Sequence, residues 1–354
     1  MSRIRPCHVS VIAMVAMWLG GSQPATAQDA LRAPPASDAP VEVSVGFRLL
    51  DIVEVNDRDQ TFEFEGRLTL RWEDPRQRFD PAQVGTDERV FQGDYQITEL
   101  FAAWRPLLVL ENDSGYFEQQ GVVLRISPDG TLTYIEEFQA VAEVDANLRH
   151  LPFDRRVFEI VFDVLGFGAD RVRLTPSLAE SAVADVGFNQ WQLEEVRAET
   201  AIAEAELAGT VEGGVSRVRF LYPSQRSPWY LLRVIVFPLA TLVALSWTVF
   251  WMSSSSLGDR LDISFIGILT VVAFQIVVAD LFPRITYFTT LDAFLYVNYL
   301  TLVGTVFVNL RVDALDRRGE EERGDRLDYT CRWLFPLGYV SALAGLVAFF
   351  SFRF

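Results

Sequence analysis

Two carboxylates flank an apolar run in the last third of the chain. Between Asp262 and Asp280, aliphatic side chains recur at intervals of three or four residues, at Ile266, Leu269, Ala273 and Ile276. This spacing places all six side chains on one face of an α-helix. A carboxylate inside a membrane segment is costly and normally faces a water-filled cavity or a partner. The face therefore indicates a path for cations, and the simpler alternative is that the aspartates lie at the two headgroup regions while the aliphatic residues pack in a bundle.

A single helix face cannot enclose a pore, so a channel needs several copies of the chain around a symmetry axis. A ring of Asp262 carboxylates would concentrate cations, and Asp259 and Asp280 would add to the field at the two mouths. The aliphatic positions between them would form a constriction that closes by losing its water. We therefore predict a cation-selective pore, with selectivity at Asp262 and Asp259 and a gate formed by Ile266, Leu269, Ala273 and Ile276.

Four apolar stretches supply the helices that would hold such a pore. They cover about 229–252, 259–281, 288–311 and 329–352 of a predicted transmembrane domain, 227–354, and each is close to the roughly 20 residues that cross a bilayer. The connecting loop 312–328 is rich in arginine, which indicates the cytoplasmic side. These features predict a multi-pass protein of the inner membrane whose N-terminal domain is periplasmic.

The first 27 residues are typical of a secretory signal peptide. Arg3 and Arg5 precede a short apolar run, and small residues end the segment at Ala27. Cleavage there is the expectation, and a retained anchor is the alternative. Cleavage would leave Cys331 and His150 as the only cysteine and histidine, which excludes an internal disulfide and makes a zinc site of His and Cys very improbable.

The region 41–226 has a different pattern, after a leader at 28–40 that is rich in Ala, Pro and Asp. Short runs alternate apolar and polar residues and are separated by turn signals, which predicts an immunoglobulin-like antiparallel β-sandwich. Residues 28–228 carry 36 acids against 19 bases, within a chain of net charge −16. Such an acidic surface disfavours a nucleic-acid partner.

Several motifs, in one order along the chain, resemble those of the pentameric ligand-gated ion channels, the Cys-loop receptor superfamily, and of its bacterial members in particular. The motifs are Trp72-Glu73-Asp74-Pro75-Arg76, Leu151-Pro152-Phe153-Asp154-Arg155-Arg156, Ser246-Trp247-Thr248-Val249-Phe250-Trp251 and Pro283-Arg284. The two cysteines that name the superfamily would fall at Val144 and Phe158, and the usual Gln of the second motif is Arg156. The resemblance implies a homopentamer that is opened by a ligand and contains no cofactor.

The resemblance also implies a ligand site between subunits, at Arg67, Glu111, Leu165 and Phe167, with Glu204 and Glu206 in the capping loop. The places that aromatic residues usually fill correspond to Arg67, Glu111 and Leu165, with Phe167 just beyond them, and the capping loop has no aromatic residue. Such a site does not suit a quaternary ammonium. A charged or zwitterionic ligand, protons or divalent cations stay open as triggers, and Arg67 as a solvated strand residue is an equal alternative. Acidic pairs such as Glu204 and Glu206 are candidates for Ca²⁺, and the simpler interpretation is a solvated acidic surface.

Coupling between the two domains is assigned by the resemblance to two sets of residues. The N-terminal domain would contribute Asp57, Asp59, Phe153, Asp154 and Arg226, and the transmembrane domain Pro283 and Arg284. We expect a buried pair between Asp154 and Arg226, with Asp57 or Asp59 nearby.

An enzyme and a membrane-tethered binding module are the two alternatives to a channel. An enzyme finds little support, because the sequence has no Gly-rich phosphate loop and no nucleophile elbow. A membrane-tethered periplasmic binding or adhesion module without a pore would explain the β-domain but not the face bounded by Asp262 and Asp280. The number of chains per particle distinguishes a pentameric channel from such a module.

Overall fold

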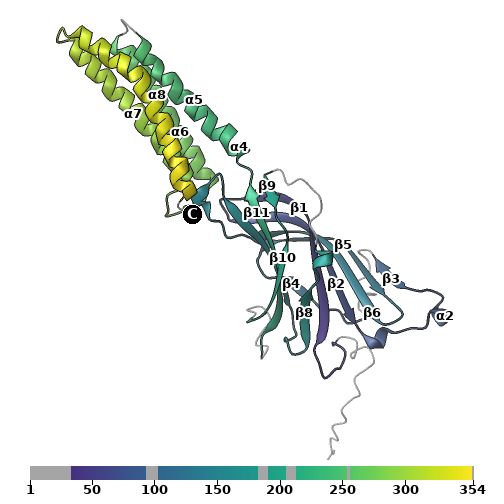
Figure 1. Ribbon diagram of the computed structural model, residues 1–354. Coiled ribbons are helices and arrows are strands. Elements are labelled where there is room, and N and C mark those ends of the chain that lie inside the picture. Colours follow the sequence, from purple (N-terminus) through teal and green to yellow (C-terminus); the bar gives the residue numbers. More distant parts are fainter. Residues whose placement is uncertain (1–32, 93–102, 182–189, 205–212, 253–255, 353–354) are drawn as a thin grey trace, which may run out of the picture.

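A computed structural model describes residues 33–92, 103–181, 190–204, 213–252 and 256–352 of the chain. An elongated β-domain is followed by four long helices that extend from one of its ends (Figure 1). The predicted signal peptide, residues 1–27, and the candidate ligand residue Glu206 lie outside the described residues.

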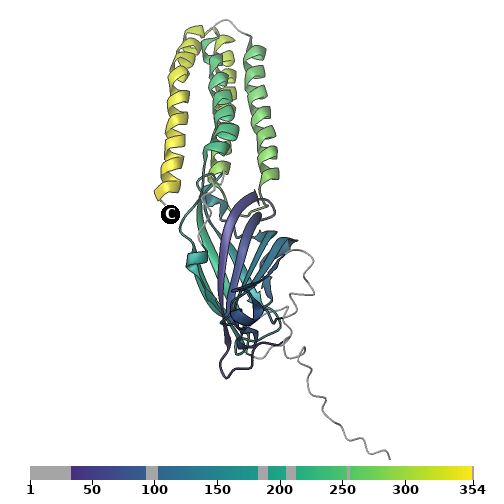
Figure 2. The same cartoon turned by 90° about the vertical axis from the view of Figure 1, so that its right-hand side faces the viewer.

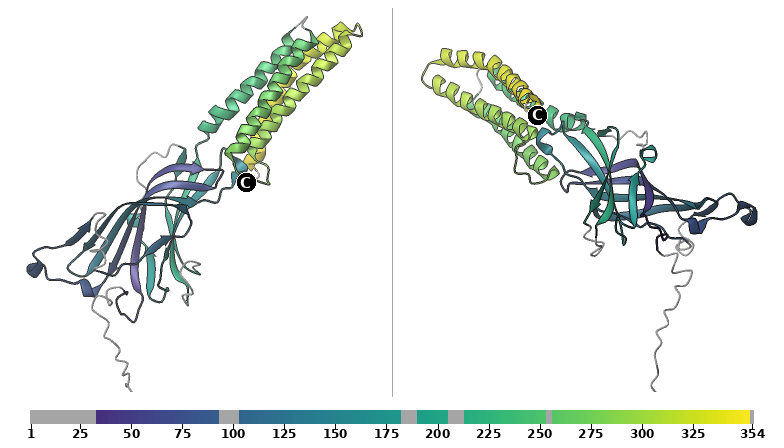
Figure 3. Two further views of the ribbon diagram at one scale, coloured as in Figure 1. Left: turned by 180° about the vertical axis from the view of Figure 1, so that it is seen from behind. Right: turned by 60° about the horizontal axis from the view of Figure 1, so that its bottom comes forward.

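Two β-sheets pack face to face in the N-terminal domain (Figure 3). The six-stranded sheet has the order β3 (Arg89–Gln92), β5 (Asp113–Ile126), β6 (Thr131–Glu143), β2 (Thr61–Glu73), β1 (Val41–Asn56) and β8 (Val172–Pro176). The five-stranded sheet has the order β10 (Arg197–Ala203), β11 (Val215–Arg226), β7 (Arg155–Val164) and β4 (Leu108–Leu110), and β9 (Trp191–Leu193) also pairs with β11. Short helical segments lie at Pro75–Gln77, α2 (Pro81–Val84), Leu148–His150 and Leu178–Glu180.

The sandwich forms because each strand alternates between a buried and an outward side chain. In β2 the buried members are Phe62, Phe64, Leu68, Leu70 and Trp72, and they meet a phenylalanine-rich core from the other strands. The predicted sandwich is confirmed, with one departure from a purely antiparallel arrangement. The pair β1–β8 is parallel, because β8 reaches β1 from β7 of the other sheet, through residues 165–171, and not through a hairpin with β1.

The transmembrane domain has four helices that are long and apolar enough to cross a membrane. The first comprises α4 (Trp229–Leu231), a π-helical turn (Leu232–Val236), α5 (Phe237–Ser246) and a 3₁₀ turn (Trp247–Trp251). The others are α6 (Leu257–Leu281), α7 (Thr290–Asp316) and α8 (Glu321–Phe352). Side-on, α6 and α8 lie at opposite sides of the bundle (Figure 2).

The segment 312–328, predicted as a loop, is mostly helical. Helix α7 continues to Asp316 and α8 begins at Glu321, so only residues 317–320 connect them. Hydropathy detects only the part of a helix that lies in the bilayer. The residues beyond it include Ala, Leu, Arg and Glu, which have high helix propensity, so the helices continue past the apolar part. The polar ends of the two helices therefore escape a prediction based on apolar length.

Candidate functional site

Helix α6 presents the predicted face away from its own subunit. Ile266, Leu269 and Ile276 are 64%, 71% and 68% exposed, and Asp262, Ala273 and Asp280 are exposed as well. The opposite face is buried against the other helices through Arg260, Ser264, Gly267, Val271 and Val278. A continuous stripe bounded by two carboxylates is thus left uncovered by the chain that carries it.

The N-terminal end of α6 is joined to α8 by a buried ion pair. Arg260 Nη2 donates to Asp328 Oδ1 at 2.6 Å, and both residues are buried. Next to it, Ser264 Oγ accepts hydrogen bonds from the Thr305 hydroxyl at 3.2 Å and from Asn309 Nδ2 at 3.3 Å. We call the Arg260–Asp328 pair the α6–α8 latch. Sequence reasoning missed it because Asp328 fell in the expected loop, although an arginine in an apolar helix is itself a signal of a buried partner.

Asp259 and Asp280 of α6 each have a hydrogen-bond partner. Asp259 lies in the first turn, where its carboxylate accepts the Ser256 hydroxyl at 2.7 Å and the Ser256 hydroxyl accepts its N–H. Asp280, at the other end, accepts a hydrogen bond from Arg58 Nη1 at 2.9 Å. Arg58 belongs to the turn between β1 and β2, so Asp280 contacts the N-terminal domain as well as ending the exposed stripe.

A buried network of four charges lies where the sandwich meets the helices. Arg226 donates to Asp154 Oδ1 at 2.8 Å and to both oxygens of Asp57, at 2.8 and 3.0 Å. Arg156 donates to Asp154 Oδ2 at 3.0 Å and lies 2.5 Å from Asp57 Oδ1. The guanidinium groups of Arg156 and Arg226 also stack on the Trp191 ring, at 4.9 and 4.4 Å from its centroid, respectively. These five residues form the junction network, in which the buried Asp154 and the half-buried Asp57 balance two buried arginines.

The predicted Asp154–Arg226 pair is therefore present, and Asp57 is its neighbour. Asp59 instead stabilises the β1–β2 turn, where it accepts a hydrogen bond from Asn56 Nδ2 at 2.9 Å. Arg156 was not predicted as a member, although its departure from the motif's usual Gln was a visible signal. Phe153 is 49% exposed, Pro283 is half-buried, and Arg284 is exposed without an ion pair among the described residues.

The loop before β7 packs into the end of the helix bundle that lies next to the sandwich. Ala146, Leu148 and Leu151 pack in the same apolar cluster as Leu231 and Leu291. The backbone joins the contact, because the Leu148 N–H donates to the Tyr287 hydroxyl at 3.1 Å and the Thr290 hydroxyl donates to the Arg149 carbonyl at 3.0 Å. Movement of this loop is thereby mechanically connected to the start of α7 and to the linker that follows α6.

The residues assigned to the ligand site do not meet within one chain. Arg67 lies on the six-stranded sheet and donates to Glu137 at 2.7 Å. Glu111 follows β4 on the other sheet and lies 2.9 Å from Arg217, which also pairs with Asp163. Leu165 and Phe167 are half-buried beyond β7, and Glu204 is exposed. A site that combines Arg67 with Glu111 would need two copies of the chain.

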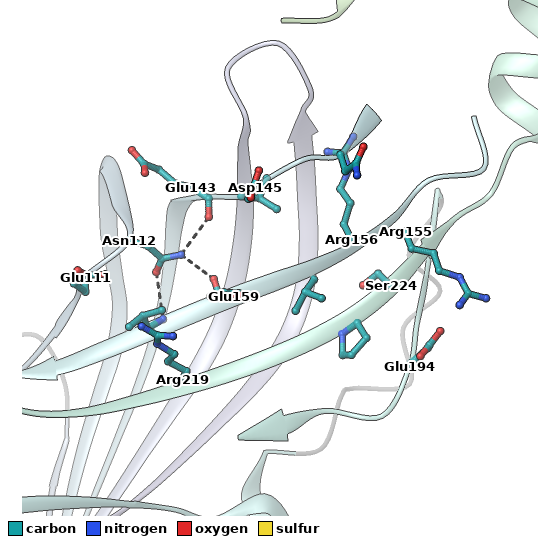
Figure 4. A pocket seen from close by; sticks show the side chains of 15 residues that line it. Glu111, Asn112, Glu143, Asp145, Arg155, Arg156, Glu159, Glu194, Arg219 and Ser224 are labelled. Atoms are coloured by element: carbon teal, nitrogen blue, oxygen red, sulfur yellow. Dashed lines mark hydrogen bonds between the residues drawn. The ribbon is translucent and has the colours of Figure 1, made fainter. Parts of the chain in front are cut away.

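A cavity of about 720 Å³ lies beside Glu111 on the outside of the five-stranded sheet (Figure 4). Asn112 holds its wall, with Nδ2 donating to the carbonyls of Glu143 and Glu159 at 3.2 and 2.9 Å. The lining side chains include acids and arginines, among them Glu143, Asp145, Arg155, Glu159, Glu194 and Arg219. This mixture suits a small charged or zwitterionic molecule better than an apolar one. Among the described residues, no group of three or more His, Cys, Asp or Glu side chains could hold a metal ion.

A second titratable cluster lies on the neighbouring strands β5 and β6, with Arg105 from the segment before β4. The Tyr134 hydroxyl donates to Glu136 at 3.0 Å and accepts from Arg105 Nη1 at 2.9 Å, while Gln119 donates to the other Glu136 oxygen at 2.6 Å. Burial raises the pKa of the Glu136 carboxyl above its ordinary value, against the opposing effect of these hydrogen bonds. Burial likewise raises the pKa of the Tyr134 hydroxyl. Glu136 is thus a carboxylate that takes up a proton more readily than a solvated one.

Comparison with known proteins agrees with this architecture. Residues 28–214 match the family described as the neurotransmitter-gated ion-channel ligand binding domain. The chain is 25% identical to the proton-gated ion channel of Gloeobacter violaceus over 97% of its own length and 92% of that protein. It is 24% identical to the acetylcholine receptor subunit beta of Xenopus laevis, over 76% of this chain and 54% of that subunit. It is 22% identical to the gamma-aminobutyric acid receptor subunit beta of Caenorhabditis elegans, over 70% of this chain and 44% of that subunit.

The family match covers more than half of the chain, and the bacterial relative aligns with both domains. The animal subunits are about twice as long as the part of them that this chain spans. The matched residues contain most of the β-sandwich, and four helices among the described residues are long and apolar enough to cross a membrane. The chain belongs to the pentameric ligand-gated ion channels and is a channel subunit, not an enzyme.

Proposed function

We propose that five identical copies of this chain form a cation-selective channel lined by α6. The observation that carries the proposal is the division of α6 into a buried face and an exposed stripe. Apolar side chains that no neighbour in the subunit covers are explained when five stripes face a common axis. Five Asp262 carboxylates would then encircle the cytoplasmic end of the pore and concentrate cations there.

The proposed gate is the apolar part of the stripe. Ile266, Leu269, Ala273 and Ile276 lie between the two carboxylate rings, and a ring of such side chains closes a pore when water leaves it. Asp262 is the main selectivity residue in this proposal. Asp259, whose carboxylate is engaged by Ser256, contributes only to the field at the same mouth.

The proposed trigger acts on the N-terminal domain as a small charged ligand, as protons or as divalent cations. The cavity beside Glu111 and the raised pKa of Glu136 support the first two, and the bacterial relative is named a proton-gated channel. Ca²⁺ at exposed carboxylates such as Glu204 is a further modulator to test. The proposal places the channel in the inner membrane with the N-terminal domain in the periplasm, after removal of residues 1–27.

The test is ion flux through purified protein in liposomes, with pH and Ca²⁺ stepped on the side of the N-terminal domain. Reversal potentials in asymmetric NaCl are compared for wild type, Asp262→Asn and, as a matched control on the same turn, Asp259→Asn. We expect cation-selective current whose selectivity falls in Asp262→Asn and changes less in Asp259→Asn. Anion-selective current, or equal selectivity in all three, would contradict the assignment of Asp262. A monomer without current would favour the tethered module.

A further inference from the structure

Helix α7 buries two asparagines whose hydrogen bonds differ. Asn298 and Asn309 are both fully shielded from solvent within the subunit. The Asn298 amide is satisfied at both ends, because its Oδ1 accepts from the Tyr339 hydroxyl at 3.0 Å and its Nδ2 donates to the Phe294 carbonyl at 2.6 Å. The Asn309 Oδ1 atom is buried and has no hydrogen-bond partner among the residues that the structure describes. A buried polar atom of this kind costs free energy unless another group binds it.

The nitrogen of the Asn309 amide fixes the orientation of the group. Asn309 Nδ2 donates to the Ser264 hydroxyl at 3.3 Å and to the Arg260 carbonyl at 3.4 Å, and both residues belong to the buried face of α6. A carbonyl oxygen only accepts hydrogen bonds, so the nitrogen and not the oxygen of the amide faces it. Asn309 Oδ1 is therefore an acceptor that needs a donor from elsewhere.

A second buried atom without a partner belongs to the same contact. Arg260 is 6% exposed and pairs with Asp328 through Nη2, but its Nε–H is buried and donates to no described residue. The contact between α6 and α7 thus contains one unsatisfied donor and one unsatisfied acceptor. A cation between them would lie beside a guanidinium, and an anion would lie beside the Asn309 oxygen and the Asp328 carboxylate. A neutral group that both accepts and donates satisfies the two atoms, and water is the smallest such group.

We propose that a buried water molecule bridges α6 and α7, accepting from Arg260 Nε and donating to Asn309 Oδ1. Buried waters bind polar groups that are otherwise unsatisfied, and a hydrogen bond through water is enthalpically close to a direct one. The bridge lies on the side of α6 opposite the exposed stripe, so it is separate from the proposed pore and does not depend on ion conduction. It extends the α6–α8 latch to α7, because Arg260 then contacts α8 through Nη2 and α7 through Nε and its carbonyl.

The first test detects the water in the unmodified protein. The full-length chain, labelled with ¹⁵N in its six asparagines, is reconstituted in liposomes, and magnetisation transfer from water to each side-chain amide is measured by solid-state NMR. Asn298 is the matched control, since it is equally buried on the same helix and also contacts a hydroxyl, but both ends of its amide are satisfied. We expect transfer to Asn309 to build up several-fold faster than transfer to Asn298. Equally slow transfer to the two amides overturns the proposal.

The second test removes the donor that the water requires. Arg260→Met, combined with Asp328→Leu so that no buried charge is left alone, should slow transfer to Asn309 several-fold, toward the Asn298 value. Arg332→Met is the control, because Arg332 Nε already donates to the Phe250 carbonyl at 2.8 Å, and it should leave transfer to Asn309 unchanged. An unchanged Asn298 signal shows that the helix bundle is intact in each variant. Fast transfer to Asn309 that persists without Arg260 would overturn the bridge.

Discussion

Arg226 illustrates how much of this molecule depends on single buried charges. Arg226→Ala would leave Asp57 and Asp154 buried against Arg156 alone. We expect a loss of about 3–5 kcal/mol in the free energy of unfolding, the usual cost of breaking a buried pair by removing one partner. Thermal unfolding of the solubilised variant measures this loss. Arg155→Ala, an exposed neighbour of Arg156, is the matched control, and equal unfolding temperatures of the two variants would contradict the role of the network.

Glu136 gives a pH-dependent prediction. Its raised pKa means that the folded state binds the proton more readily than the unfolded state. Its contribution to stability is therefore fully present at acid pH and is lost as pH rises through the folded-state pKa. Glu136→Gln, which resembles the protonated acid, should raise the unfolding temperature by a few degrees at neutral pH and leave it unchanged at acid pH.

Glu137→Gln is the control for the Glu136 prediction. Glu137→Gln removes a carboxylate that pairs with Arg67 at the surface, so it should not reproduce the pH-dependent difference. Unfolding temperatures measured from pH 4 to 8 compare the three proteins. A constant offset between Glu136→Gln and wild type across this range would show that burial of the charge is not the cause.

Individual residues also show where sequence reasoning reaches its limit. Asp154 with Arg226 was predictable from a motif, because both lie in segments with a recognisable pattern. Arg58 with Asp280 and Arg260 with Asp328 were not, since these partners are 222 and 68 residues apart. Arg260 in an apolar helix indicates that a partner exists but not which residue it is. The ligand residues Arg67 and Glu111 were named individually, but their geometry depends on a neighbouring copy.

At the scale of elements, α6 was predicted best because its pattern is periodic and local. The spacing of 3.6 residues per turn fixed the exposed stripe before any tertiary contact was considered. The alternation in β2 fixed the sandwich in the same way. The parallel pairing of β8 with β1 and the polar ends of α7 and α8 depend on tertiary contacts or on propensity outside the membrane, so hydropathy could not supply them.

The apolar stripe of α6 predicts the behaviour of the gate. Leu269→Ser places a hydroxyl at the most exposed apolar position of the stripe, which should ease wetting and raise the current without agonist several-fold. Val272→Ser changes an exposed residue of the same helix that lies off the stripe, and its basal current should stay at the wild-type level. Unchanged closure in Leu269→Ser, or an equal leak in both variants, would place the gate elsewhere.

The α6–α8 latch predicts how α8 stabilises α6. Asp328→Asn leaves Arg260 buried without a carboxylate and should cost about 3–5 kcal/mol in unfolding free energy. Asp325→Asn, an exposed position on the same helix, should cost little. The double variant Arg260→Met with Asp328→Leu should recover most of the unfolding free energy lost in Asp328→Asn. Failure to recover it would show that the unpaired charge of Arg260 is not the cause of that loss.

At the scale of the whole molecule, the exposed stripe of α6 predicts an assembly. Sedimentation of the detergent-solubilised chain of 40.0 kDa should give a particle of five chains. The physical reason is that Ile266, Leu269 and Ile276 are each more than three-fifths exposed in the single subunit. A stable monomer would contradict both the pentamer and the pore, and would favour a tethered binding module.

The boundary between the two domains holds two kinds of ion pair, and dissolved salt distinguishes them. The junction network is shielded from solvent, whereas Arg58 and Asp280 are 59% and 76% exposed. Mobile ions weaken exposed pairs and leave buried ones nearly unaffected. High salt would therefore weaken the contact between the C-terminal end of α6 and the β1–β2 turn. The first membrane helix would stay attached to the sandwich through the junction network. The ionic strength of the surroundings thus sets how firmly α6 is held against the N-terminal domain.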